Sequence, residues 1–449
     1  MLLEDGRGDA GRARLAWGAR ARHRLEWSAS GIGRLSWLAT LPADRRLYGT
    51  LAYDLGLPPH ARRADPIVPQ PLADFFEPAH ELVVDCGTGE LLVGNWEELG
   101  GTAERDGGTA ERRNGGTSPH VLSSSRTPVH PVLRSRTLSQ LEFESAVRRI
   151  KAYIAAGDVY QVNLAVGECY QTALTPWELY LRVRVVNPSP WMGFADFGDW
   201  QIVSGSPELL VEIGGSAERR HGGTAERRNG GTIQVMDRQE QGVRPADGSV
   251  PAAVPPFRRS AVIRTRPIAG TRKKTGDPDR DAAMRAELTL DIKEQAEHRM
   301  LVDLARNDVG RVAEFGSVHV AEREVIEEYS HVFHLVSDVV GLLRADRTVT
   351  DAVAALFPGG TITGAPKIRA MEVIAELEPV ARGAYTGGLG WLGPDGAQLN
   401  ILIRSAVFRD GAVGIHAGAG IVWDSDPARE WRESLRKAAA MRVALGTEP

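Results

Sequence analysis

Two pairs of glutamates in this sequence could bind a metal ion. Glu294 and Glu297 lie three residues apart in a segment of helical periodicity, and Glu430 and Glu433 repeat that spacing in another. Residues three apart share one helix face, so each pair would present two carboxylates side by side. Four carboxylates converging from two helices suit a hard cation with oxygen ligands, such as Mg²⁺. The alternative is two solvated helix faces with ordinary ion pairs, which the spacing alone favours.

The segment FPGGTITGAPKIRAM, residues 357–371, could bind an anion. Gly359, Gly360 and Gly364 let the backbone approach a ligand closely, and an amphipathic helical pattern follows them. Backbone N–H groups at such a helix N-terminus favour anions, and Lys367 adds a positive charge. The alternative is a glycine-rich turn and helix cap that binds nothing.

Helices are expected to carry both glutamate pairs. The first pair lies in a segment, 287–306, whose apolar spacing predicts one continuous helix. Before the second pair, Asp426 is a favourable N-cap and Pro427 suits the first helical position. Another helix should begin after Ser139, which forms a capping box with Glu142.

Strands are expected before and between these helices. An Arg-Leu-x-Trp repeat of ten residues, at 14–17, 24–27 and 34–37, is typical of short strands in a meander. Turn residues near the C-terminus predict hairpins between further strands. The expected strands from residue 47 onward cover 47–57, 81–93, 159–166, 200–213, 384–392, 397–408 and 412–422.

Two glycine-rich insertions divide the chain. The sequence GGTAERRNGGT occurs at 107–117 and again at 222–232. Such composition cannot bury enough surface to order itself, so both copies are expected to be disordered. An arginine-glycine tether for nucleic acid is the alternative, which the glutamate in each copy disfavours. We expect an N-terminal β-rich subdomain, 1–135, with an insertion at 100–118, and a catalytic domain, 136–449, with an insertion at about 214–260.

Composition excludes several classes of partner. The net charge of -4 gives no overall basic field, so nucleic acid is not expected. No apolar run is long enough to span a membrane. Cys86 and Cys169 lack a paired spacing, which disfavours disulfides and zinc and fits a reducing, cytoplasmic location. The N-terminus lacks the apolar region of a secretory signal.

Nine segments between residue 139 and the C-terminus resemble the chorismate-utilising enzymes, and they occur in family order. That family includes the component I subunits of aminodeoxychorismate synthase and anthranilate synthase, and the isochorismate and salicylate synthases. The segments are GDVYQVNL (157–164), SGSPELL (204–210), RPIAGTR (266–272), DIKEQAEHRMLVDLARND (291–308), HVFHLVS (331–337), FPGGTITGAPKIRAME (357–372), GAYTGGLG (383–390), NILIRSA (400–406) and HAGAGIVWDSDPAREWRES (416–434). The expected N-terminal effector motif is missing.

The resemblance implies a fold and a set of site residues. The fold would be α+β, with a large two-sheet core covered by helices. Both glutamate pairs look like the Mg²⁺ ligands that join the metal to the ring carboxylate of chorismate, which reverses the preference from spacing alone. Further residues look like anchors for the substrate, through a side-chain charge or donor, through a backbone amide, or through their position in a family motif. They are Thr363, Gly364, Ala365, Lys367, Tyr385, Arg404, Gly418, Lys437 and Ala269.

Catalytic roles are implied for a smaller group. Glu208 looks like the general acid that protonates the departing 4-hydroxyl, a task that needs a raised pKa. His334 resembles the family histidine near the reacting ring. Thr361 and Thr363 lie where small differences separate the family's branches, so this loop would help to choose the product. The alternatives are a buried histidine bonded to backbone and an arginine in an ordinary ion pair.

Gln161 indicates ammonia as the nucleophile. Family members that add water have a lysine base at this position, and glutamine cannot take a proton from water. Neither cysteine lies in the Gly-x-Cys-x-Gly setting of class I amidotransferases, so a separate glutaminase partner should supply ammonia.

Different motifs of the sequence favour different products of the amination. YQVNL and GGTITGAPK look like aminodeoxychorismate synthase, whereas Ala269 replaces the lysine of PIKGT and resembles anthranilate synthase. We expect aminodeoxychorismate synthase, with ammonia attacking C2, and keep anthranilate synthase as the second reading. An inactive paralogue that only binds is the alternative of another class, which the complete set of acids disfavours.

Overall fold

A computed structural model gives the fold of the protein. It describes residues 1–5, 12–25, 34–58, 61, 66–85, 91–93, 131–214, 261–329 and 332–447. Both GGTAERRNGGT copies, Trp27 and Cys86 lie outside these residues, so the expectations about them stay predictions.

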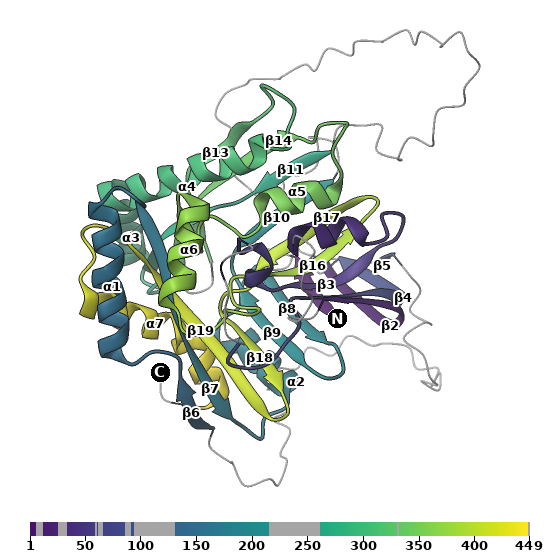
Figure 1. Cartoon of the computed structure of the whole chain (residues 1–449), viewed down its shortest axis with the longest axis horizontal. Coiled ribbons are helices and arrows are strands. Elements are labelled where there is room, and N and C mark those ends of the chain that lie inside the picture. The colour runs from purple at the N-terminus through teal and green to yellow at the C-terminus, as the bar shows by residue number, and fades with distance from the viewer. Residues whose placement is uncertain are drawn as a thin grey trace.

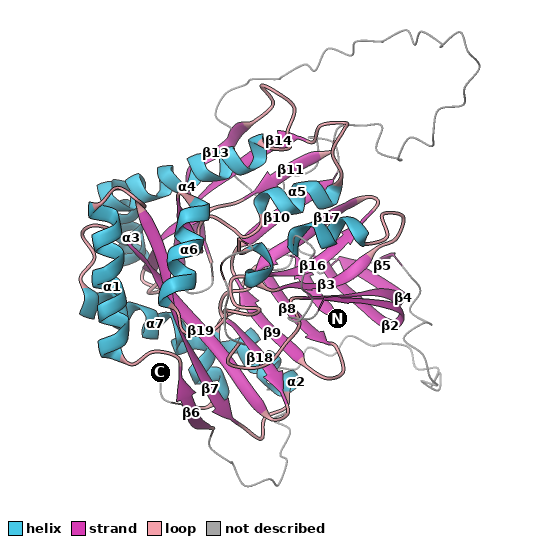
Figure 2. Ribbon diagram, viewed as in Figure 1, coloured by secondary structure: helices cyan, strands magenta, loops and turns pink. Residues whose placement is uncertain are grey.

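Helices lie on the outside of the strands over much of the described chain (Figure 2). The α-helices are α1 (Gln140–Ala155), α2 (Pro176–Val186), α3 (Pro278–Leu290), α4 (Ile292–Gly310), α5 (Val349–Leu356), α6 (Lys367–Leu377) and α7 (Pro427–Leu445). Two 3₁₀ helices, η2 (Arg34–Thr40) and η3 (Tyr53–Gly56), lie near the N-terminus. The expected caps are confirmed, because Ser139 forms the capping box of α1 and the Asp426 side chain accepts from Arg429 N at the start of α7.

The expected single helix over 287–306 is wrong. The chain forms α3 and α4 with a break at Asp291, which ends the first helix and caps the second. Its carboxylate accepts hydrogen bonds from Lys293 N and Glu294 N, which satisfies two N–H groups at the start of α4. The first glutamate pair therefore lies in the first turns of α4.

The strands form two groups. The first group is β3 (Leu47–Leu51), β4 (Ala73–Asp85), β5 (Leu91–Val93), β10 (Leu209–Gly214), β11 (Val262–Thr265), β12 (Ile268–Lys273), β13 (His319–Glu328), β14 (Val332–Leu342), β16 (Gly388–Gly393) and β17 (Gly396–Ile401). The second group is β1 (Leu2–Asp5), β2 (Arg12–Leu25), β6 (Val132–Arg136), β7 (Gln161–Gln171), β8 (Trp191–Asp196), β9 (Gln201–Ser206), β15 (Gly364–Ala365), β18 (Ser405–Arg409) and β19 (Ala412–Ile421).

Antiparallel pairing joins the two groups into one hydrogen-bonded network. The first group runs from β13 and β14 through β11, β10, β17 and β16 to β3 and β4. The second runs from β2 through β1, β8, β9, β18 and β19 to β7. Pairing of β4 with β2 connects them. The α+β class is confirmed, and the two expected sheets are two parts of this network (Figure 1).

The N-terminal strands are integral to this network, since β1 pairs with β8 and β3 pairs with β16. The proposed domain boundary at residue 135 stays a prediction. In the ten-residue repeat, the first copy lies in β2, whereas the copy at 34–37 begins η2 instead of a strand. Trp37 and Leu38 of η2 are buried in the main core, so tertiary packing overrides the strand-like pattern there.

The chain passes between the two strand groups at two neighbouring corners. One corner joins β9 to β10, and the other joins β17 to β18. The sequence predicted a single strand in both places, over 200–213 and over 397–408, and both predictions are wrong. Arg404 has φ 50° at the second corner, a left-handed conformation that interrupts the strand. Gly205 N donates to Arg404 O at 3.0 Å and Ile401 N donates to Glu208 O at 3.0 Å. These bonds fix the two corners against each other.

A large apolar core supports the corners and the glycine-rich segment. Leu51, Phe143, Val162, Val353 and Ile374 are fully buried in it, from strands and helices far apart in the sequence. Each such side chain contributes roughly 1.5–3 kcal/mol of burial free energy. In the described part of the chain, no helix is both long and apolar enough to cross a membrane.

Candidate active site

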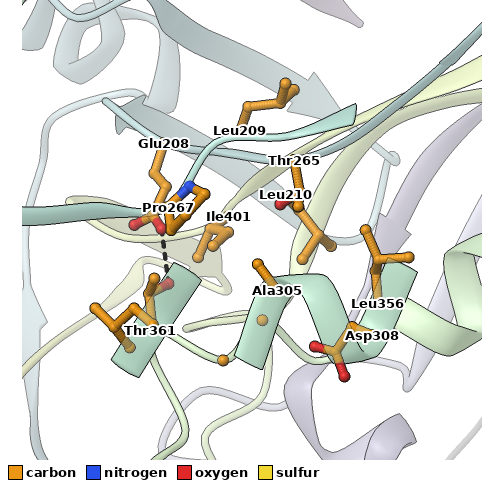
Figure 3. Close-up of a pocket in the computed structure, with 13 residues that line it drawn as sticks. Glu208, Leu209, Leu210, Thr265, Pro267, Ala305, Asp308, Leu356, Thr361 and Ile401 are labelled. Carbon is orange, nitrogen blue, oxygen red and sulfur yellow. Dashed lines mark hydrogen bonds between the residues drawn. The ribbon is translucent and has the colours of Figure 1, made fainter. Parts of the chain in front are cut away.

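Glu208 lies at the corner between β9 and β10, where Pro207 interrupts the strand. The residue is only 5% exposed, and its Oε1 accepts a hydrogen bond from Thr361 Oγ1 at 2.7 Å (Figure 3). Burial raises the pKa of the Glu208 carboxyl to about 7, although the Thr361 hydroxyl and the Ile268 amide act in the opposite direction. The carboxyl can therefore hold and release a proton near neutral pH.

Arg404 lies at the second corner and faces the same region. Its Nη1 donates to Asn187 Oδ1 at 3.0 Å, and no carboxylate among the described residues forms an ion pair with it. Burial lowers the pKa of Arg404, and the charge of Glu208 opposes that effect. Guanidinium remains charged even so, and its planar donors suit a carboxylate. The arginine is thus available to an anionic ligand.

His334 lies on β14 with 3% of its surface exposed. Its Nδ1 is 3.0 Å from Thr271 Oγ1 and 3.3 Å from Gly270 O, while Nε2 is buried and has no partner in the described structure. Burial lowers its pKa to about 4, so the ring is neutral at pH 7. A neutral ring with its proton on Nδ1 carries a lone pair on Nε2 and can accept a proton there.

Ala269 lies on β12 opposite Leu335 of β14, beside the bulge at Gly270. Its side chain is a buried methyl group, so it offers neither a charge nor a nucleophile.

Gln161, at the start of β7, is 2% exposed. Its Nε2 donates to Glu297 Oε1 at 2.8 Å, which fixes the orientation of the amide because an ionised carboxylate only accepts. Its Oε1 is buried, and no described residue donates to it. A buried acceptor without a donor is costly in the free protein and is available to a small ligand with N–H groups.

The glycine-rich segment packs on β7 through β15. Gly364 has φ 134°, and a Cβ there would lie 2.2 Å from Gln161 O, so only glycine fits. Gly418 on β19 is similarly constrained, because a Cβ there would lie 2.5 Å from Leu164 O. Ala365 pairs with Gln161 in the β15–β7 ladder. These contacts explain the glycines by close backbone packing.

Two backbone amides of the glycine-rich turn, which were expected to be free to bind the substrate, already donate hydrogen bonds within the protein. Thr363 N and Gly364 N donate to Gly360 O at 3.2 and 3.1 Å, and the Thr363 hydroxyl donates to Gly359 O at 2.8 Å. Binding of a substrate carboxylate by these two amides would require them to exchange that partner, and it stays a prediction. By contrast, Pro366 provides no side-chain cap for α6.

Lys367 and Tyr385 are both largely buried. The Lys367 ammonium forms an ion pair with Asp308 of α4, so its charge is already matched, a contact that sequence spacing could not predict. Tyr385 stacks on His416 with ring centroids 5.4 Å apart, and burial raises its pKa further above its usual range. Tyr385 therefore keeps its proton and can donate a hydrogen bond.

The four glutamates lie on α4 and α7 but each has a different environment. Glu294 accepts from Arg272 at 3.2 Å, Glu297 accepts from Gln161, and Glu433 lies 3.0 Å from the half-exposed ammonium of Lys437. Glu430 is 7% exposed. Within the residues that the structure describes, no three acidic, histidine or cysteine side chains are close enough together to hold a metal ion.

The donor set nevertheless fits Mg²⁺ in its chemistry. Burial raises the pKa of Glu297 and of Glu430, and neighbouring Glu294 and Glu433 respectively add to that effect. Carboxylates that are buried near each other are stabilised by a cation, and hard oxygen ligands are those that Mg²⁺ prefers. Lys437 lowers both pKa values, which places its charge near both pairs.

Three supporting residues contact the predicted site residues, and the sequence had singled out only the first of them. Thr361 contacts Glu208, Asn187 contacts Arg404, and Thr271 contacts His334. Thr361 was singled out because it lies in the segment where the family's branches differ, and its contact with Glu208 was not predicted. The others are separated from their partners by 217 and 63 residues, so only tertiary structure pairs them.

The family model described as chorismate binding enzyme matches residues 12–220 and 257–443. The chain therefore belongs to the chorismate-binding enzyme family. Its members include enzymes that aminate chorismate, and relatives of that kind are similar to this chain over most of its length.

Three similar proteins illustrate the range. The aminodeoxychorismate synthase component 1 of Bacillus subtilis (strain 168) is 43% identical over 304 residues, which are 68% of this chain and 55% of that protein. The anthranilate synthase component I-like protein of Synechocystis sp. is 38% identical over 414 residues, 90% of this chain and 73% of that protein. The anthranilate synthase component 1 of Pseudomonas aeruginosa is 41% identical over 316 residues, 70% of this chain and 55% of that protein.

The match thus spans only about half the length of two of these relatives. Among solved structures, anthranilate synthase component I from Streptococcus pneumoniae TIGR4 aligns with a TM-score of 0.70 and 28% identity, covering 96% of this chain and 92% of that one. These similarities support the family and the fold.

Proposed function

We propose that this protein is an aminodeoxychorismate synthase component I, which uses ammonia to convert chorismate to 4-amino-4-deoxychorismate. The observation that carries the amination is Gln161, whose Nε2 is held by Glu297 and whose Oε1 has no donor among the described residues. Ammonia has N–H groups for that oxygen and keeps a lone pair for attack, so no base is needed before the carbon–nitrogen bond forms.

Glu208 would supply the proton that leaves with the 4-hydroxyl as water. Its carboxyl is secluded and has a pKa of about 7, so a large fraction is protonated near neutral pH. Arg404 and Tyr385 would hold substrate carboxylates, because both are largely buried donors and no carboxylate among the described residues accepts a hydrogen bond from either side chain.

Mg²⁺ would be held by Glu294, Glu297, Glu430 and Glu433. When bound, the ion neutralises the ring carboxylate and orients the substrate. Lys437 could keep its ion pair with Glu433, because a carboxylate has two oxygens and can accept from an ammonium while it binds a metal ion. Removing divalent ions with a chelator should abolish turnover, and Mg²⁺ should restore it.

The position of the new bond requires two displacements. Attack at C2 with loss of the 4-hydroxyl leaves the amine on C2, and a second ammonia must attack C4 as the C2 nitrogen departs. Because residue 269 is alanine, no lysine side chain at this position can be the first nucleophile, so ammonia is the nucleophile in both displacements. The net change replaces hydroxyl by amine at C4 and releases water.

Anthranilate synthase component I is the second candidate, and Ala269 favours it. If the C2 amine loses pyruvate before a second ammonia arrives, the ring becomes aromatic and the product is anthranilate. Loss of the ring proton needs a base, and the neutral His334 with its free Nε2 is suited to that task.

Incubation with chorismate, Mg²⁺ and ammonium tests the proposal directly. We expect 4-amino-4-deoxychorismate; pyruvate and fluorescent anthranilate would establish the second candidate instead. Chorismate binding without turnover would indicate an inactive paralogue. Gln161→Leu should raise the KM for ammonia more than tenfold while the Kd for chorismate changes little, and an unchanged ammonia KM would remove the role of Gln161.

The relatives are named component 1, which supports a separate glutaminase as the partner that supplies ammonia. A glutaminase subunit that confers glutamine-dependent activity on this protein would establish the partnership. The cytoplasmic location is likewise part of the proposal.

A further inference from the structure

Arg382 is a buried arginine with every donor used. It follows α6 and is 1% exposed. Its Nε and Nη2 donate to the carboxylate of Glu378, Nη1 donates to Ile362 O at 2.9 Å and Thr386 Oγ1 at 3.3 Å, and Nη2 also donates to Asn163 O at 2.9 Å. Arginine has five N–H donors, so the guanidinium is saturated and cannot bind a ligand.

These bonds tie the glycine-rich turn to β7. Three successive carbonyls of the turn each have a donor from Asn163 or Arg382. Asn163 Nδ2 donates to Thr361 O, Arg382 donates to Ile362 O, and Asn163 N donates to Thr363 O, all at 2.9 Å. Arg382 also donates to Asn163 O, so its planar guanidinium connects the turn to β7.

The turn carries the hydroxyl that contacts the acid. Thr361 Oγ1 lies 2.7 Å from Glu208 Oε1, yet Glu208 is at the β9–β10 corner, 153 residues away in the chain (Figure 3). The hydrogen bond therefore depends on where the turn is held relative to that corner. A hydrogen bond weakens steeply as its distance and angle depart from the favoured values.

We propose that Arg382 is a positioning residue, which holds Thr361 on the carboxyl of Glu208 by clamping the turn onto β7. The inference rests on the proposed role of Glu208 as the acid. Lysine could retain the charge beside Glu378 but cannot reach two carbonyls and a carboxylate at once, because its ammonium lacks the planar fork.

Other groups around Glu208 keep their charges when Arg382 is changed to lysine. The positive charge of Arg404 lowers the pKa of the Glu208 carboxyl and also that of His334. Asp308 of α4 lines a cavity together with Glu208 (Figure 3), and its carboxylate is paired with Lys367. A change in the proton affinity of Glu208 in the variant would therefore report the Thr361 contact.

The test is a ¹³C NMR titration of Glu208, assigned by loss of its signal in Glu208→Gln, in wild type and Arg382→Lys. Because the Thr361 hydrogen bond lowers the pKa of Glu208, we expect a higher pKa in Arg382→Lys, and a higher one again in Thr361→Val. In the amination assay, kcat should fall roughly ten- to a hundredfold in Arg382→Lys with a smaller change in chorismate KM.

Arg442→Lys is the matched control, since Arg442 is another buried arginine paired with a glutamate, Glu168. It should lower the melting temperature without moving the pKa of Glu208. If Arg382→Lys does not fold, Asn163→Ala removes the donor to Thr361 O and should raise that pKa.

Two results would overturn the inference. One is that Thr361→Val shifts the pKa of Glu208 whereas Arg382→Lys and Asn163→Ala both leave that pKa unchanged. The other is an unchanged pKa in Thr361→Val itself. The titration needs no turnover, so absence of amination in wild type would refute the proposed function separately.

Discussion

Glu208 owes its proton affinity to burial, which outweighs the hydrogen bonds it accepts. The same cause acts on His334 in the opposite direction, because burial disfavours the charged form of either group. An acid that is protonated near pH 7 and a histidine that is neutral there can coexist in one site. At the scale of single residues, the site is thus defined by seclusion from water as much as by residue type.

Glu208→Gln should lower kcat by roughly 10²–10⁴-fold, because glutamine has the same shape but cannot deliver a proton to the leaving hydroxyl. Chorismate affinity should change little. Steady-state kinetics and a direct binding measurement check both expectations. Near-normal kcat in the variant would mean that another group is the acid.

The pH dependence follows from the same carboxyl. Glu208 must be protonated to act, so the rate should fall as pH rises through about 7. Free ammonia increases over the same range, so the rate must be compared at a constant concentration of free ammonia. A rate that stays level from pH 6 to pH 9 under that condition would contradict the assignment.

Elements position the site through corners and close contacts. The two corners bring Glu208 and Arg404 together, the break at Asp291 starts α4 just before its glutamates, and β15 holds the glycine-rich turn on β7. Each arrangement joins segments that are far apart in the sequence. At this scale the geometry of the site depends on how the elements pair. The insertion at 215–260 lies in the sequence between β10 and β11, which pair with each other.

Replacing residues 215–260 by a short glycine-containing turn should leave the fold and the amination rate within about twofold. Gly214 of β10 and Val262 of β11 are register partners, so a tight turn can connect them directly. Circular dichroism and kinetics check this. A folded variant with a collapsed rate would show that the replaced segment contributes to the site.

At the scale of the whole molecule, several histidines are secluded from water, as Glu208 is. His298 and His334 are buried, and the Nε2 atom of the partly exposed His416 is buried as well. Burial lowers the pKa of each ring to about 4. A histidine with a lowered folded-state pKa binds its proton more weakly than in the unfolded chain. Its contribution to stability is therefore full above pH 6.5 and is lost as pH falls toward 4.

His416→Phe should make stability less sensitive to acid. Wild type should lose about 1.4 kcal/mol per buried histidine between pH 7.5 and pH 5.5, from the value of one pKa unit. Glu208 acts in the opposite direction, so the difference between variant and wild type is the useful quantity. Urea unfolding at both pH values measures it, and equal losses in the two proteins would contradict the role of His416.

Much of the site was predictable because its signals are local. Caps such as Ser139 and Asp426, the glutamate spacing, and the segments shared with the chorismate-utilising enzymes are all read within a few residues of sequence. They give the α+β class, the helix starts and the identity of candidates such as Glu208, Gln161 and His334. The roles of those residues stay proposals.

Tertiary structure decided what those residues touch. It split the strand predicted over 397–408 into β17 and β18, paired Lys367 with Asp308, and joined Thr361 to Glu208. Such contacts depend on packing between elements that are separated by tens to hundreds of residues, and no local pattern encodes them. The sequence alone therefore determined which groups are present, whereas burial and proximity, which set their proton affinities and partners, came from the folded arrangement.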